Sequence, residues 1–139
     1  MIVRNILPIL LLILLAFSES LATDYTTTGS GAWTDPIWAP VGTPGGGDNV
    51  VIDIGHNLTL PSGVTVTNLT INGSLDQSGQ SLQVDGTIAG NGTLTSSNSS
   101  LVLNGDLNFS GTFTSNSSTS FTIGGAGAYT AFPSITGGL

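Results

Sequence analysis

The stretch LVLNGDLNFSGTF, residues 101–113, alternates between two kinds of side chain. Its odd positions are apolar or glycine, whereas its even positions, after Val102, are small and polar or acidic. Successive side chains of a β-strand point to opposite sides, so this alternation is typical of strands with one buried face. Gly105 and Gly111 interrupt the apolar face, which indicates bends or close approaches of the backbone. The stretch therefore predicts short, half-buried strands joined at glycine-containing corners.

The same phrase of alternating apolar residues and glycine recurs along the chain. It reappears nineteen residues earlier, twenty residues later, and once more around residues 69–75, after a shorter step of thirteen. Self-similarity with a period near twenty indicates a stacked repeat, in which each unit covers its neighbour. The aligned positions of the two longer steps are Leu82, Val84, Gly86, Ile88, Gly92 and Leu94 before the quoted stretch, and Phe121, Ile123 and Gly125 after it.

These repeats predict an all-β fold, a parallel β-helix with coils of about 19–20 residues. No segment after residue 23 has the 3.6-residue periodicity of an amphipathic helix. Ordering one coil costs about 1–2 kcal/mol per residue, so only a stack of coils is stable. We expect Leu103 to lie buried between Val84 and Ile123 of the neighbouring coils. The expected inward set is Leu82, Val84, Ile88, Leu94, Leu101, Leu103, Leu107, Phe109 and Phe113.

A polar residue precedes several of the repeat glycines, namely Asn72, Asp85 and Asn104. If the coils stack in register, these three side chains form a ladder along one edge, as amide side chains do in cross-β assemblies. Asn-Gly and Asp-Gly are also favoured turn pairs, and turn preference alone explains the same pattern. The sequence leaves both interpretations open.

Residues 1–22 have the layout of a secretory signal peptide. Arg4 precedes an apolar run of twelve residues, ILPILLLILLAF, and Ser20-Leu21-Ala22 supplies a small-x-small cleavage site. The run is shorter than the roughly 20 residues that span a bilayer, which argues against a membrane anchor. We therefore expect a secreted or cell-surface protein with no membrane span after signal cleavage.

The expected mature chain is acidic and has almost no charged chemistry. It contains seven Asp but no Glu, Lys or Arg, and the whole chain lacks Cys. Phosphate binding depends on Lys and Arg, so nucleic acid is excluded as a partner. The absence of Cys excludes disulfides and thiolate chemistry.

The segment before the repeat carries a resemblance to a known group of proteins. Trp33 and Trp38 precede DNVVIDIGHNLTL, residues 48–60, and the order of these motifs resembles the opening of many secreted bacterial right-handed parallel β-helix proteins. It is also similar to the opening of the eight-glycine domain. The resemblance covers about residues 31–125 and implies a right-handed β-helix in an adhesin-like surface protein or stalk.

We divide the chain accordingly into residues 1–22 (signal peptide), 23–47 (N-terminal cap), 48–125 (β-helix coils) and 126–139 (glycine-rich tail). The tail resembles a spacer that leads into further strands, as in the N-terminal portion of a longer protein. It offers no cap, and exposed strand edges favour end-to-end self-association.

Few residues suggest catalysis. Asp85 and Asp106 lie close in the repeat alignment and could form a glycosidase pair, but no basic residue accompanies them. His56 is the single histidine, so a zinc site lacks ligands. Asp48 and Asp53 offer a weak structural calcium site, with turn formation as the alternative. We expect no enzymatic activity and no cofactor.

Binding is the function that the residues favour. Trp33, Trp38 and Tyr129 could stack on sugars, although the two Trp residues also suit a cap over the core. We expect an adhesin-like structural module with cell-surface glycans or surface proteins as partners; the alternative is a carbohydrate-binding or carbohydrate-active β-helix. Seven glycosylation sequons are present, at Asn57, Asn68, Asn72, Asn91, Asn98, Asn108 and Asn116.

Overall fold

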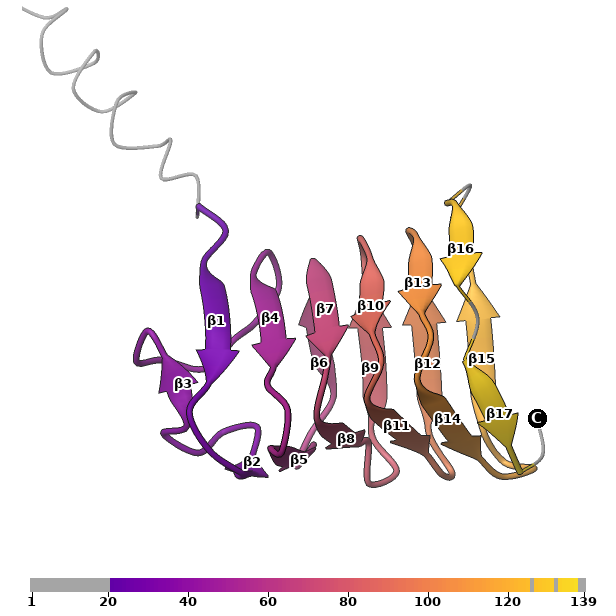
Figure 1. The fold of residues 1–139 in the computed structure, drawn as a ribbon, viewed down its shortest axis with the longest axis horizontal. Coiled ribbons are helices and arrows are strands. Elements are labelled where there is room, and N and C mark those ends of the chain that lie inside the picture. The colour runs from indigo at the N-terminus through magenta and orange to yellow at the C-terminus, as the bar shows by residue number, and fades with distance from the viewer. Residues whose placement is uncertain (1–20, 126, 132, 138–139) are drawn as a thin grey trace, which may run out of the picture.

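The computed structural model describes residues 21–125, 127–131 and 133–137, which form a parallel β-solenoid of about five turns (Figure 1). Its regular elements are all strands. The expected signal peptide lies outside the described residues, apart from Leu21 and Ala22. Within the part of the chain that is described, no helix is long and apolar enough to cross a membrane.

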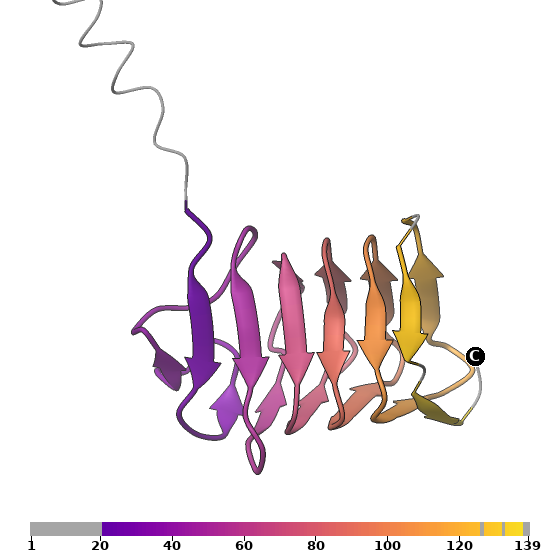
Figure 2. The ribbon, with the colours of Figure 1, turned by 45° about the horizontal axis from the view of Figure 1, so that its top comes forward.

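The strands form three sheets that stack along the solenoid, and the smallest of them begins in the second coil (Figures 1 and 2). The seven-stranded sheet contains β1 (Asp24–Thr27), β4 (Asn49–Ile52), β7 (Asn68–Ile71), β10 (Ile88–Gly90), β13 (Leu107–Phe109) and β16 (Tyr129–Ala131), with β3 (Trp38–Ala39) antiparallel to β1. The six-stranded sheet contains β2 (Gly31–Ala32), β5 (Asn57–Thr59), β8 (Ser74–Asp76), β11 (Thr93–Ser96), β14 (Thr112–Ser115) and β17 (Ser134–Thr136). The four-stranded sheet contains β6 (Val64–Val66), β9 (Ser81–Val84), β12 (Ser100–Leu103) and β15 (Ser120–Ile123).

The register of the central coils confirms the predicted period. Ile88 pairs with Leu107, and Leu82 pairs with Leu101, each nineteen residues apart. Leu103 pairs with Val84 on one side and Ile123 on the other, and it is fully buried, as the repeat predicted. The step of twenty to β15 arises at the corner formed by residues 116–119, which is one residue longer than its counterpart in the preceding coil.

The step of thirteen that the sequence suggested is wrong. Leu69 and Ile71 pair with Ile88 and Gly90 of the next coil, so the step there is again nineteen. The alternating phrase ending in glycine occurs at two different corners of each coil. Aligning Leu69 with Leu82 therefore matched strands of different sheets.

Parallel pairing begins before the expected boundary at residue 48. β1 pairs with β4, and β2 pairs with β5, in the same parallel sense as the later strands. At the other end, β16 and β17 extend two sheets into the glycine-rich tail by pairing with β13 and β14.

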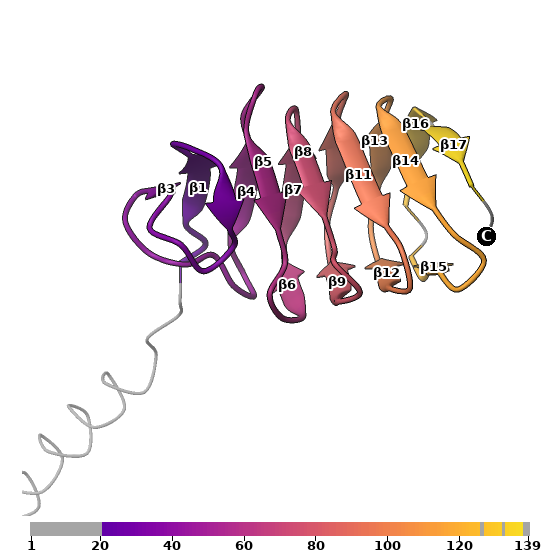
Figure 3. The same cartoon turned by 90° about the horizontal axis from the view of Figure 1, so that it is seen from below.

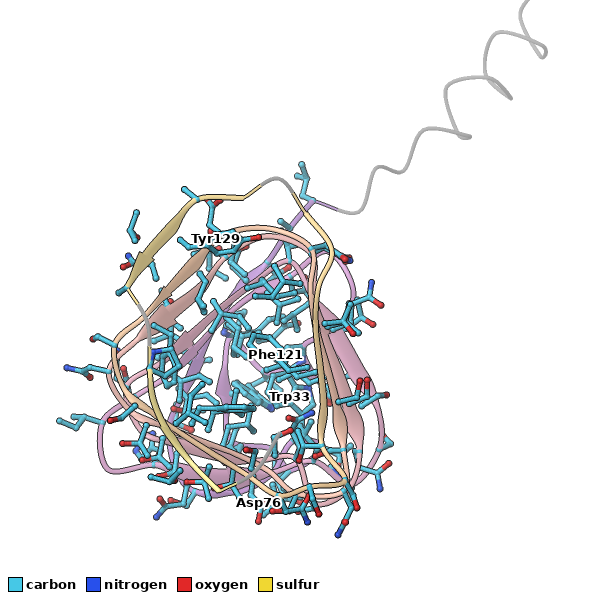
Figure 4. The ribbon with its side chains drawn as sticks, turned by 90° about the vertical axis from the view of Figure 1, so that its right-hand side faces the viewer. Trp33, Asp76, Phe121 and Tyr129 are labelled. Carbon is cyan, nitrogen blue, oxygen red and sulfur yellow. The ribbon has the colours of Figure 1, made fainter. Side chains whose placement is uncertain are left out.

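The core is a continuous apolar column inside the coils (Figure 4). All nine residues of the expected inward set are buried. Trp33 and Trp38 extend the column at its N-terminal end, with ring centroids 4.9 Å apart. Phe121 packs against the other end, with its ring centroid 5.6 Å from that of Phe113.

Glycine recurs at the corner between the seven-stranded and six-stranded sheets because the backbones of successive coils meet there. A Cβ atom on Gly92 would overlap the carbonyl oxygen of Gly73, and one on Gly111 would overlap that of Gly92. The same amides and carbonyls carry the hydrogen bonds between coils: Thr93 N–H donates to Gly73 O at 2.9 Å, and Thr112 N–H donates to Gly92 O at 2.9 Å. A side chain here would force these hydrogen bonds apart.

The corner that follows the six-stranded sheet is polar on its inner side. Buried Leu60 in one coil is followed at the equivalent place by buried Gln77, Ser96 and Ser115. Gln77 Nε2 donates to the carbonyl oxygens of Gln80 at 3.1 Å and Ser100 at 3.0 Å. Its Oε1 atom is buried without a hydrogen-bond partner among the described residues.

Candidate functional site

A ladder of hydrogen bonds joins four coils at the N-terminal ends of the strands of the seven-stranded sheet. Asn49 Nδ2 donates to Asp24 Oδ1 at 2.7 Å, and Asn68 Nδ2 donates to Asn49 Oδ1 at 2.7 Å. Asn68 Oδ1 in turn accepts the backbone N–H of Thr87 at 2.7 Å. Sequence analysis missed this ladder, although Asn49 and Asn68 are nineteen residues apart and both begin a strand.

The ladder predicted from Asn72, Asp85 and Asn104 is correct for two of its three members. Asn104 Nδ2 donates to Asp85 Oδ1 at 2.9 Å, which links neighbouring coils. Asn72 follows β7 at a different corner of its coil, so it does not belong with them. Gln83 Nε2 also donates to Asp85 Oδ1, at 2.7 Å. The hydrogen bonds from Gln83 and Asn104 hold the pKa of the Asp85 carboxyl below its ordinary value.

A third polar pair fixes the corner after the six-stranded sheet. Asn116 Nδ2 donates to Asn98 Oδ1 at 3.1 Å, and Asn116 Oδ1 accepts the backbone N–H of Asn98 at 3.1 Å. Asn98 has a positive φ of 53°, a conformation that Asn tolerates better than most residues. This reciprocal pair places the serine-rich corners of successive coils in register.

The carboxylates are distributed rather than convergent. Asp85 stacks on Asn104, whereas Asp106 Oδ1 accepts the backbone N–H of Ala128 at 2.7 Å, so the proposed glycosidase pair has separate partners. Asp48 accepts the backbone N–H groups of Thr23 at 3.0 Å and Gly45 at 2.9 Å, which is a turn-forming role. No group of three or more acidic or histidine side chains with the geometry of a metal site occurs among the described residues.

His56 lies at the corner between β4 and β5 and contacts the preceding coil. Its Nδ1 atom is 2.7 Å from the hydroxyl oxygen of Thr27, which is buried. The same hydroxyl oxygen accepts the backbone N–H of Asp53 at 2.9 Å. His56 therefore contributes to the join between the first two coils.

The two Trp residues are not exposed for sugar stacking. Trp33 and Trp38 are 1% and 3% exposed, and their indole N–H groups donate to the carbonyl oxygens of Pro44 at 3.0 Å and Trp33 at 2.8 Å. A cleft of about 330 Å³ lies beside Trp33, at the free edge of β6, with residues 43–46 and 62–65 around it. Tyr129 is exposed at the opposite end of the solenoid, and its hydroxyl donates to Gly125 O at 3.2 Å.

The outer surface of the six-stranded sheet presents aligned rows of side chains. Its central strands lie side by side in Figure 3. The strands β11 and β14 read Thr-x-Thr at paired positions: Thr93 pairs with Thr112, and Thr95 pairs with Thr114. The residues between them, Leu94 and Phe113, point into the core. This face therefore presents rows of hydroxyl groups over a fixed apolar support.

Comparisons of the chain with protein-family models, curated proteins and solved structures find no match. The class of protein that the fold defines is the parallel β-solenoid.

Proposed function

We propose that the chain is a non-catalytic, adhesin-like structural module of a secreted or cell-surface protein, which binds through its outer sheet faces. The observation that carries this proposal is the combination of a nineteen-residue register in the central coils with side-chain ladders between coils. Such a scaffold holds outward side chains in fixed rows, and a preorganised surface loses little entropy on binding.

The distribution of acidic groups supports binding rather than catalysis. Asp85 and Asp106 hydrogen-bond to different neighbours, and neither lies beside a basic side chain, because residues 21–139 contain no Lys or Arg. Hydrolysis of a glycosidic bond needs two carboxylates that face one substrate.

The last described coil supports end-to-end association as a second mode of assembly. β15, β16 and β17 form one edge of all three sheets, and the exposed apolar side chains of Ile123, Tyr129 and Ile135 lie on them. Exposed edges and apolar groups favour pairing with another copy. Sedimentation velocity over a range of concentrations should show this association, and a constant monomer would contradict it.

The proposed function is tested by exposing the purified chain to insoluble plant and bacterial polysaccharides and to whole cells. Retention on any of these surfaces without new reducing ends or unsaturated products supports a binding module. Release of such products by the parent chain, and its loss in Asp85→Asn, would establish a carbohydrate-active enzyme instead.

A further inference from the structure

Ten outward side chains form a two-row array on the six-stranded sheet. Parallel pairing aligns the two rows from β5 to β17, and the members of each row follow one another from coil to coil. Eight of the ten side chains carry a hydroxyl group, and only Asp76 is charged. The first row is Asn57, Ser74, Thr93, Thr112 and Ser134; the second is Thr59, Asp76, Thr95, Thr114 and Thr136.

The array has two repeat distances that follow from sheet geometry. Neighbouring strands lie about 4.8 Å apart, and residues two positions apart on one strand are separated by about 6.6 Å. The prism faces of hexagonal ice also present oxygen atoms in a rectangular lattice with two repeats of this order. The rows of hydroxyl groups therefore offer hydrogen-bonding partners at regular intervals in two directions at once, as a crystalline water surface does.

The hydroxyl groups are held in place and are free to bind outward. Threonine is β-branched and has a restricted χ1 angle, and the buried Leu94 and Phe113 fix the strands beneath the array. Among the described residues, the hydroxyls of Thr93, Thr95 and Thr112 make no hydrogen bond within the chain. Thr114 and Thr136 contact each other at 3.2 Å across the coils. The central hydroxyls can therefore donate to and accept from external water.

The composition of the face selects the kind of partner. With one carboxylate and no basic group, the array is unsuited to charged ligands. It also contains no outward aromatic ring on which a sugar could stack. A neutral, flat partner with a matching hydrogen-bonding lattice is the best fit.

We propose that the outer surface of the six-stranded sheet adsorbs to ice. Adsorbed protein would inhibit further growth of the crystal because ice must then advance as curved fronts between the bound molecules. The inference rests on the proposed function in one respect only, namely that an outer face of the solenoid is its binding surface.

The array contains an internal control in Asp76, the one charged member, which lies on the outer side of the coil (Figure 4). Asp76 interrupts the second row between Thr59 and Thr95. Its carboxylate accepts the backbone N–H of Ser78 at 2.7 Å, a local turn interaction. Replacing it with threonine should complete the row and strengthen adsorption.

The test measures the thermal hysteresis gap and the shape of ice crystals grown in solutions of the purified chain. The parent chain should produce faceted crystals and a measurable gap. Thr95→Tyr should lose the gap, because a large ring breaks the flatness of the array, whereas Asp76→Thr should widen it. The matched control is Thr70→Tyr, at an outward, half-buried position of β7 in the seven-stranded sheet.

Each outcome decides between alternatives, provided that circular dichroism shows all variants folded. Rounded crystals and no gap for the parent chain would overturn the inference. Equal loss in Thr70→Tyr and Thr95→Tyr, or a narrower gap in Asp76→Thr, would overturn the assignment to this face. Binding to polysaccharides or cells without any effect on ice would leave the proposed function standing and refute ice adsorption.

Discussion

Replacing Gly92 with alanine should destabilise the solenoid, although Gly→Ala changes often stabilise proteins. A Cβ atom at Gly92 would overlap the carbonyl oxygen of Gly73 and lie 2.8 Å from the carbonyl carbon of Asn72. Both are backbone atoms of the preceding coil, so relief requires the coils to separate. Separation weakens the hydrogen bonds that Gly92 N–H donates to Ile71 O at 2.8 Å and Thr93 N–H donates to Gly73 O at 2.9 Å.

The expected loss follows from two contributions. Overpacking at a rigid contact costs about 1–3 kcal/mol, and a weakened backbone hydrogen bond costs about 0.5–1.5 kcal/mol. The smaller entropy of the unfolded alanine variant offsets about 0.4–1 kcal/mol. The free energy of unfolding should therefore fall by about 0.5–4 kcal/mol, with a central value of about 2 kcal/mol, compared with the roughly 5–15 kcal/mol of a typical domain.

Gly46→Ala is the matched control for this prediction. A Cβ atom there meets no other atom within 4 Å, and Gly46 does not occupy the left-handed backbone region. Only the unfolded-state effect remains, so this variant should be more stable by up to about 1 kcal/mol. Urea unfolding followed by far-ultraviolet circular dichroism measures both changes. If the two variants shift the midpoint in the same direction, close contact between coils is not the reason for the recurring glycine.

Three further results are expected. Leu103→Asp should prevent folding, because it places an unpaired charge in the core, whereas Val102→Asp on the outer face should fold. If the two variants melt at the same temperature, the register is wrong. The lowered pKa of Asp85 stabilises the fold above the ordinary pKa of aspartate, and this contribution is lost as the pH falls through the folded-state value. The free energy of unfolding of Asp85→Asn should therefore fall less steeply than that of the parent between about pH 5 and pH 2. Parallel plots of stability against pH for the two chains would contradict this. Amide hydrogen exchange should be slowest at Val84 and Leu103 and fast beyond Gly124, where most residues are exposed, and uniform protection along the chain would count against this gradient.

The sequence allowed the strand type, the period and the buried set to be predicted, because apolar alternation and stacking have direct signatures. The pairing of Leu103 with Val84 and Ile123 follows from aligning the glycine phrases of three coils. The link between Asp85 and Asn104 follows from the same alignment. These features depend only on positions nineteen or twenty residues apart.

Other features could not be read from the same pattern because the three sheets share one alternation. Asn72 and Asp85 both precede a glycine, yet they occupy different corners, and only the three-dimensional path of the coil distinguishes them. The first coil was hidden for another reason. Residues 33–47 increase the number of residues between β2 and β5, so Gly31 pairs with Leu58 rather than with a residue nineteen positions later.

The short pairing between β2 and β5 has a mechanical consequence. Hydrogen bonds between coils run along the axis of the solenoid, so a pull along that axis loads each junction between coils in series. The junction between β2 and β5 has two residue pairs, compared with four between β11 and β14. Under tension applied on the N-terminal side, the coil that contains β1 and β2 should peel away first. Its hydrogen bonds then break one after another, so this junction opens at a lower force than the junctions between the longer strands that follow.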